Sequence, residues 1–171
     1  MSSDKISDKI SISDNKNSSK SLLNSEGFGI SNGVSTILAL LAGFYATKTP
    51  KFTAMGALLS LLLTDPINDS FSIYVSMKHN NPDIAYNTFI GTFVSQVGIQ
   101  LLFLIILFYS SNVYNAFIIS SVIGMLLLLY DYNKRFKNKK AIMKELSKIL
   151  TLIFITFVIN TLFYKYYHNK L

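Results

Sequence analysis

Two acidic residues, Asp65 and Asp69, lie inside an otherwise apolar stretch of the chain. An Asp near the centre of a bilayer costs about 2.5–3.5 kcal/mol on insertion scales, and such residues usually serve a function. Because the two are four residues apart, they share one face of a helix and lie about 6 Å apart along its axis. Pro66 stands between them and predicts a helix kink that loosens the carbonyl of Leu62. The segment therefore gathers oxygen ligands at one depth.

Such ligands suit Fe²⁺, Mn²⁺, Mg²⁺ or Ca²⁺. The predicted metal ligands are Asp65, Asp69 and, from the preceding apolar segment, Asn32. Two carboxylates in a low dielectric cannot both stay charged at low cost, so we expect them to hold protons when empty and to release them to a divalent ion. That exchange predicts proton-coupled antiport of a transported metal, with no permanently bound cofactor. The residues expected to support the ligands are Ser31, Thr36, Asn68, Ser72, Ser76 and Met77.

The composition indicates what positions these residues. Residues 84–130 form a run of 47 residues without Asp, Glu, Lys, Arg or His, and charged residues make up only 15% of the chain. A soluble domain usually carries about 25% charge. The chain is therefore predicted to be an all-α integral membrane protein in contact with the lipid bilayer, since its apolar blocks are continuous and do not alternate as barrel strands do.

Several function classes are excluded by what the sequence lacks. Without cysteine there is no disulfide framework and no thiolate metal site. Neither a Ser/His/Asp set nor a phosphate-binding glycine loop is present, so we expect no enzyme. The net charge of +7 resides mainly in basic residues beside the apolar blocks, which indicates membrane topology and no nucleic-acid partner.

Five blocks have about the length of 20 residues that a membrane helix needs. Residues 1–26, of which nine are Ser, are predicted to form a disordered tail before the membrane domain 27–171. The least marked break is Ser110-Ser111-Asn112, and a polar loop is expected from Asp131 to Lys148. The predicted spans are roughly residues 29–47, 52–77, 84–109, 112–130 and 146–166.

Five spans place the two termini on opposite sides of a membrane. With these spans, 12 of the 16 Lys and Arg residues fall on the side of the N-terminus and 4 on the other side. Because basic residues are retained on the cytoplasmic side, we expect a cytoplasmic N-terminus and a lumenal or extracellular C-terminus. The vacuolar membrane, another endomembrane and the plasma membrane all fit this prediction.

Three short segments carry a resemblance to a known family. Residues 31–36 are SNGVST, residues 39–43 are ALLAG, and residues 72–76 are SIYVS. These resemble the first and second helices of the vacuolar iron transporter family, over roughly residues 27–80. The resemblance implies transport of Fe²⁺ or Mn²⁺ by a homodimer, which would offer four carboxylates.

The chain departs from that family at the positions that matter for metal binding. The Asp of the family's first helix is Asn32 here, the Glu of its second-helix signature is Ile73, and a metal-contacting Met falls on Asp69. The soluble metal-binding helices that the family places between its second and third spans are missing. The resemblance therefore implies a short, divergent member, in which Asp65 and Asp69 replace the charge lost at Asn32.

Other interpretations of the same residues stay open. The acids can instead hydrogen-bond partner helices within a packed core, in a non-transporting scaffold or accessory protein that retains the fold. A proton or cation channel is a third possibility. Ala39 and Gly43 favour close helix packing, and a further polar line runs along the third span through Thr88, Thr92, Ser95 or Gln96, and Gln100.

Overall fold

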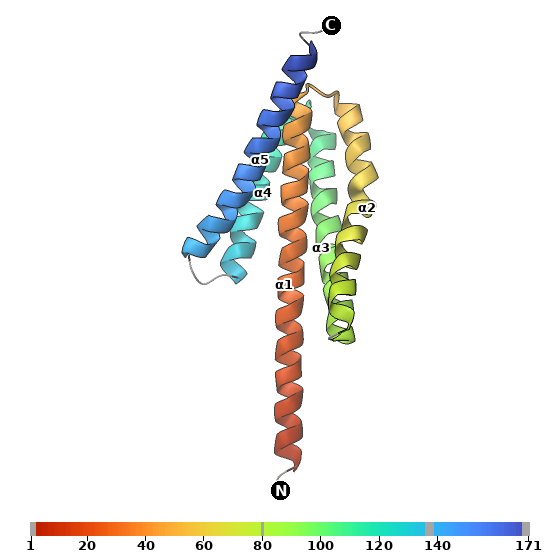
Figure 1. Cartoon of the computed structure of the whole chain (residues 1–171), viewed down its shortest axis with the longest axis vertical. Helices are drawn as coiled ribbons and strands as arrows, with labels where there is room; N and C mark the ends of the chain where they lie inside the picture. Colours follow the sequence, from red (N-terminus) through yellow and green to blue (C-terminus); the bar gives the residue numbers. More distant parts are fainter. Residues whose placement is uncertain (1–2, 80, 136–138, 169–171) are drawn as a thin grey trace.

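The computed structural model describes residues 3–79, 81–135 and 139–168, and every regular element in them is an α-helix. The helices run alternately in opposite directions, so that α1 begins at one end of the molecule and α5 ends at the other (Figure 1). Their bounds are α1 (Ser3–Ala46), α2 (Lys51–Lys78), α3 (Pro82–Tyr109), α4 (Val113–Arg135) and α5 (Lys139–His168).

Among the residues that the structure describes, four helical segments are long and apolar enough to cross a membrane. They are Ser25–Ala46, Pro82–Tyr109, Val113–Arg135 and Ile142–Tyr166. The expected all-α architecture is thus confirmed, and the four segments indicate a membrane protein. The helix α2 is present as expected but is not one of the four, since polar residues such as Asp65 and Asp69 lower its mean hydropathy.

The break between α3 and α4 lies where the sequence predicts it. The chain leaves α3 at Ser110, whose backbone N–H still donates to the carbonyl of Ile106 at 3.0 Å. The side chain of Asn112 then accepts a hydrogen bond from the backbone N–H of Asn115 at 2.8 Å. A side-chain oxygen in this position satisfies a free donor at the start of a helix, so Asn112 begins α4.

The structure differs from the prediction at the N-terminal tail. The helix α1 begins at Ser3, so residues 3–26 continue the first helix as backbone α-helix instead of forming a disordered tail; residues 1 and 2 lie outside the described residues. No Gly or Pro precedes Gly27. Extending an existing helix costs far less than starting one, so nothing in this segment stops the helix.

The prediction of a polar loop from Asp131 to Lys148 is wrong. The helix α4 continues to Arg135 and α5 already begins at Lys139; the residues between them lie outside the described part of the chain. The guanidinium of Arg135 donates to the carboxylate of Asp131 one turn earlier, and Tyr132 is buried. An ion pair at this spacing and a buried aromatic ring both extend a helix beyond its apolar block.

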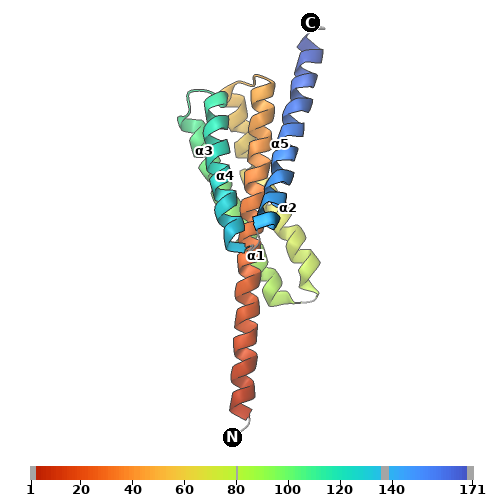
Figure 2. The same cartoon turned by 90° about the vertical axis from the view of Figure 1, so that its left-hand side faces the viewer.

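The core lies around α1, which packs against α3, α4 and α5, whereas α2 packs mainly against α3 (Figures 1 and 2). Val34 and Leu41 of α1 and Phe103 of α3 are fully buried. The close approach of α1 and α3 requires Gly29, where a Cβ would lie 2.5 Å from the backbone oxygen of Thr92. Many other large apolar side chains are exposed, as contact with hydrocarbon would require.

Candidate functional site

The two acids of α2 meet three carboxamides from neighbouring helices. Gln96 Nε2 on α3 donates to Asp69 Oδ2 at 2.8 Å and to Asp65 Oδ2 at 3.1 Å. Gln100 Nε2 donates to Asp65 Oδ2 at 3.1 Å, and Asn32 Nδ2 on α1 donates to Asp69 Oδ2. The shared face of the two acids is therefore confirmed, and the three predicted ligands Asp65, Asp69 and Asn32 lie in one hydrogen-bonded cluster.

Matching spacings on two helices produce this cluster. The acids are four residues apart on α2, and Gln96 and Gln100 are four residues apart on α3, so each pair occupies one face of its helix. Both glutamines are buried, while both acids are half-buried. Pro66 is buried within a continuous α2; the kink there stays a prediction.

The cluster holds more acceptors than donors. Gln96 Oε1 and Gln100 Oε1 are buried and have no hydrogen-bond partner among the described residues. Neither Asp65 nor Asp69 forms a salt bridge with a described Lys, Arg or His. Buried acceptors are normally paired, so a proton or a cation would complete this arrangement.

Within the described residues, no three His, Cys, Asp or Glu side chains come together as a metal-binding group. One chain thus contributes two carboxylates and neutral amide groups. A divalent ion held by oxygen atoms usually has six or more ligands, some of them water. The acid pair of a single chain is therefore at most part of a coordination shell.

Ser31 does not join the acids, contrary to expectation. Its hydroxyl lies 2.7 Å from the hydroxyl of Tyr132 on α4. Consecutive residues of a helix point about 100° apart. Because Asn32 faces α2, its neighbour Ser31 is turned towards α4.

The supporting residues on α2 also lie apart from the cluster. Asn68, Ser72 and Ser76 are exposed, and the Ser72 hydroxyl donates to the backbone oxygen of Asn68 at 2.7 Å. They are exposed because α2 packs mainly against α3 and has few contacts with α1. Met77 is half-buried and lies eight residues beyond Asp69, or about 12 Å along the helix, too far to share a ligand with it.

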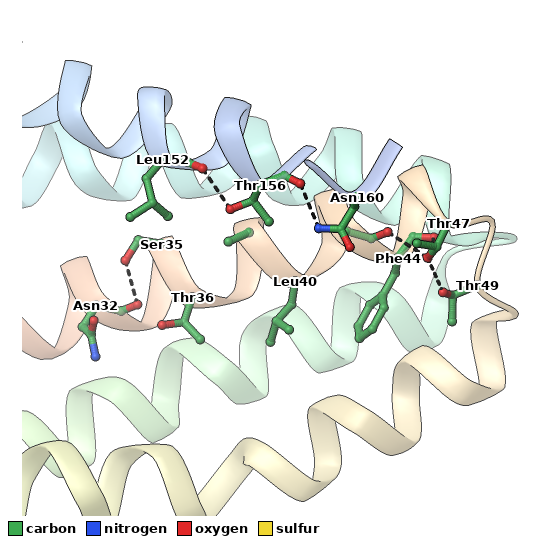
Figure 3. Close-up of a pocket in the computed structure, with 12 residues that line it drawn as sticks. Asn32, Ser35, Thr36, Leu40, Phe44, Thr47, Thr49, Leu152, Thr156 and Asn160 are labelled. Carbon is green, nitrogen blue, oxygen red and sulfur yellow. Dashed lines mark hydrogen bonds between the residues drawn. The ribbon is translucent and has the colours of Figure 1, made fainter. Parts of the chain in front are cut away.

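Thr36 lines a groove of about 560 Å³ between α1 and α5 (Figure 3). Asn32 lies at one end of this groove, so the same side chain touches both the groove and Asp69. None of the lining residues is Asp, Glu, Lys, Arg or His. The polar residues among them include Asn32, Ser35, Thr36, Thr47, Thr156 and Asn160.

A further acid lies on α4, where the sequence predicted a loop, and this one is buried. Asp131 is 5% exposed, and Arg135 Nη2 donates to its Oδ2. The guanidinium also lies over the ring of Tyr132, 5.2 Å from its centroid. The signal that could have revealed this pair is its spacing of four residues, which places both charges on one helix face.

The fold and the cluster define a class of protein. The described residues form an all-helical bundle with four segments of membrane-spanning length, in which two half-buried carboxylates are held by amide groups. No family model, curated protein or solved structure matches the chain.

Proposed function

We propose that this chain is a membrane transporter of divalent metal ions, Fe²⁺ or Mn²⁺, which exchanges the metal for protons and moves it out of the cytoplasm. The observation that carries the proposal is the carboxylate pair that shares the single amide of Gln96. No described basic residue neutralises either acid. A half-buried pair of negative charges held by neutral amides is costly, and protons or a cation would remove that cost.

The proposal requires α2 to cross the membrane, and the chain direction supports this. The helices α1 and α3 run in the same direction, and α2 connects the end of α1 to the start of α3 (Figure 1). If α1 and α3 both cross the bilayer, α2 must cross it too. Its 28 residues extend about 42 Å, longer than the hydrocarbon layer.

The contact of Asn32 with Asp69 supports a distant relationship to the vacuolar iron transporter family. Where the first helix of that family carries an Asp, this chain carries Asn32, and the side chain that Asn32 touches is an acid of the second helix. A negative charge is thus retained at nearly the same place but supplied from α2. We therefore propose a short, divergent member with a cytoplasmic N-terminus and a lumenal or extracellular C-terminus.

An exposed stripe on α2 supports a homodimer. Its hydroxyls donate to their own helix, as Ser60 does to the oxygen of Gly56 at 3.0 Å and Thr64 to that of Ser60 at 2.9 Å. Small residues with satisfied hydroxyls let two membrane helices approach closely. Two chains joined here would bring two acid pairs together. The stripe repeats every four residues and consists of Gly56, Ser60, Thr64, Asn68, Ser72 and Ser76.

One observation favours the rival interpretation, a membrane scaffold that does not transport. The Oδ2 atom of each acid already accepts two amide hydrogen bonds. Such bonds alone can hold α1, α2 and α3 together. In that case the acids stay protonated and never exchange their protons for a metal.

Flux measurements separate the two functions. The full chain is reconstituted in liposomes, and Mn²⁺ entry and proton release are followed with two indicator dyes. We expect Mn²⁺ entry coupled to proton movement, and a loss of at least about tenfold when Asp65→Asn and Asp69→Asn remove the exchangeable charges, because each tenfold step corresponds to only about 1.4 kcal/mol. The matched control is Asp83→Asn, which removes an exposed acid at the start of α3.

Flux in the parent no greater than in empty liposomes would overturn the transporter and leave the scaffold. Equal flux in the parent and in the variant without both acids would also overturn it. An electrical current without any metal gradient would indicate a channel instead.

A further inference from the structure

We infer that one face of α5, near the start of the helix, binds an anionic phospholipid, with the phosphate between Lys144 and Lys148 and an acyl chain along the residues that follow. The inference requires only that the bundle lies in a bilayer, so it does not depend on metal transport. It rests on a groove in which positive charge and apolar surface are separated along the helix.

The groove has a volume of about 620 Å³ and follows a single helix. The helix α5 lies at the edge of the bundle, and in its described part only Ile142 and Leu146 are buried (Figures 1 and 2). A molecule from outside the bundle can therefore reach the groove. The lining residues all belong to α5, and they are Lys144, Ser147, Lys148, Thr151, Leu152, Ile155 and Thr156.

The end of the groove nearest the start of α5 carries two positive charges. Lys144 and Lys148 are exposed, lie one turn apart, and belong to the segment Ile142–Tyr166, which has the length and hydropathy of a membrane span. Lys148 Nζ donates to Glu145 Oε1 at 2.7 Å, whereas Lys144 forms no salt bridge with a described acid. An ammonium group has three hydrogens, so Lys148 can donate to a phosphate as well. The exposed hydroxyl of Ser147, which lies between the two lysines in the sequence, can add a further donor.

The surrounding sequence favours an anionic headgroup over a zwitterionic one. Residues 131–148 contain seven Lys or Arg residues and only two acids, and each acid is paired with one of the basic residues. Basic residues at the edge of a bilayer attract anionic lipids. A lysine within a membrane span extends its flexible side chain to the interface, where the phosphate groups of lipids lie.

The rest of the groove suits an acyl chain. The apolar side chains of Leu152 and Ile155 are about half exposed. The hydroxyls of Thr151 and Thr156 donate to backbone oxygens one turn earlier, at 2.8 and 2.9 Å, so their hydrogens are already used. From Lys144 to Ile155 the helix rises about 16 Å, which is about half of the hydrocarbon layer. The groove thus has the length of one lipid leaflet.

Fluorescence quenching by brominated lipids tests this site, because the native sequence contains no tryptophan. Ile155→Trp places a reporter in the groove, and Val94→Trp places a control reporter at an exposed apolar position in the middle of α3. The full chain is reconstituted in phosphatidylcholine vesicles that contain equal amounts of either brominated phosphatidylglycerol or brominated phosphatidylcholine. Bromine quenches a tryptophan only at close range, so the quenching by each lipid reports its affinity for the surface around the reporter.

We expect phosphatidylglycerol to bind beside the Ile155→Trp reporter at least about fivefold more tightly than phosphatidylcholine, because one lysine near an anionic surface contributes about this factor. At the Val94→Trp reporter the two lipids should quench equally. Equal preference at the two reporters would overturn the inference. So would a groove in which neither lipid quenches, which would mean that a second copy of the chain covers it. Leu152→Trp is a second groove reporter if Ile155→Trp does not fold.

Charge variants in the reporter background show whether the groove itself selects the lipid. Lys144→Gln with Lys148→Gln should remove the preference for phosphatidylglycerol. The matched control, Lys134→Gln with Lys139→Gln, removes the same charge at the same end of the bundle but outside this groove. It should change the preference by less than about twofold, because exposed charges at a distance are screened by salt. A preference that survives without Lys144 and Lys148, or that falls equally in the control, would overturn the inference.

Discussion

Two acid sites in the described part of the bundle differ in burial and in counter-charge. On α4, Asp131 is paired with Arg135 of the same helix. On α2, Asp65 and Asp69 are held only by the neutral amides of Gln96, Gln100 and Asn32. The first site carries its own counter-charge one turn away, whereas the second has two acids and no described basic partner.

This difference separates an anchor from the exchange site that we propose on α2. An ion pair holds its surroundings in place, and here it lies against Gly27 of α1, where a Cβ would be 2.6 Å from Asp131 Oδ1. The hydroxyl of the neighbouring Tyr132 lies 2.7 Å from the hydroxyl of Ser31, which is also on α1. The Asp131 site thus joins α1 to α4. An amide can hydrogen-bond an acid in either protonation state, so the α2 site tolerates the gain and loss of a positive charge.

The largest expected effect is on the anchor. Arg135→Gln leaves a carboxylate buried without its partner, which typically costs about 3–5 kcal/mol of stability. We expect a loss of this size in the free energy of unfolding, measured by denaturation in lipid–detergent bicelles. The matched control is Lys148→Gln at the exposed pair Lys148–Glu145, which should cost about 1 kcal/mol or less.

The double variant Asp131→Asn with Arg135→Gln sharpens this test. It removes both charges together, so most of the lost stability should return. If Arg135→Gln costs no more than the exposed control, the anchor does not exist and the two acid sites do not differ in the way described.

The second prediction concerns the amide that joins the α2 acids. Gln96→Leu removes a donor from both carboxylates, and hydrogen bonds to charged groups contribute about 1.5–3 kcal/mol. We expect a loss of unfolding free energy in that range at a pH high enough to remove the protons from the two acids. In a background carrying Asp65→Asn and Asp69→Asn the same change should cost only about 1 kcal/mol, the value for neutral partners. An equal cost in both backgrounds at that pH would show that the acids stay protonated, as the scaffold interpretation requires.

Much of the fold follows from the sequence because apolar length and helical period are local properties. The break at Ser110-Ser111-Asn112 and the shared face of Asp65 and Asp69 were predictable for that reason. The extension of α4 was missed because it depends on the pair Asp131–Arg135, whose charges resemble those of a loop.

The contacts between helices were harder to predict. A polar line through Gln96 and Gln100 is visible in the sequence, but which helix it faces depends on how α3 is rotated in the bundle. That rotation is set by packing, for example by the close approach at Gly29. The same holds for Ser31, which is adjacent to Asn32 in the chain yet contacts a different helix.

The smallest expected effect, and the one that most directly compares the two sites, is stabilisation by metal. A ligand at ten times its Kd stabilises the folded state by about 1.4 kcal/mol. We expect Mn²⁺ to raise the unfolding temperature of the parent and of Asp131→Asn alike, but not that of the variant with Asp65→Asn and Asp69→Asn. Because protons compete with the metal for the same carboxylates, the shift should shrink as the pH is lowered. A shift that disappears in Asp131→Asn and persists without the α2 acids would reverse the roles of the two sites.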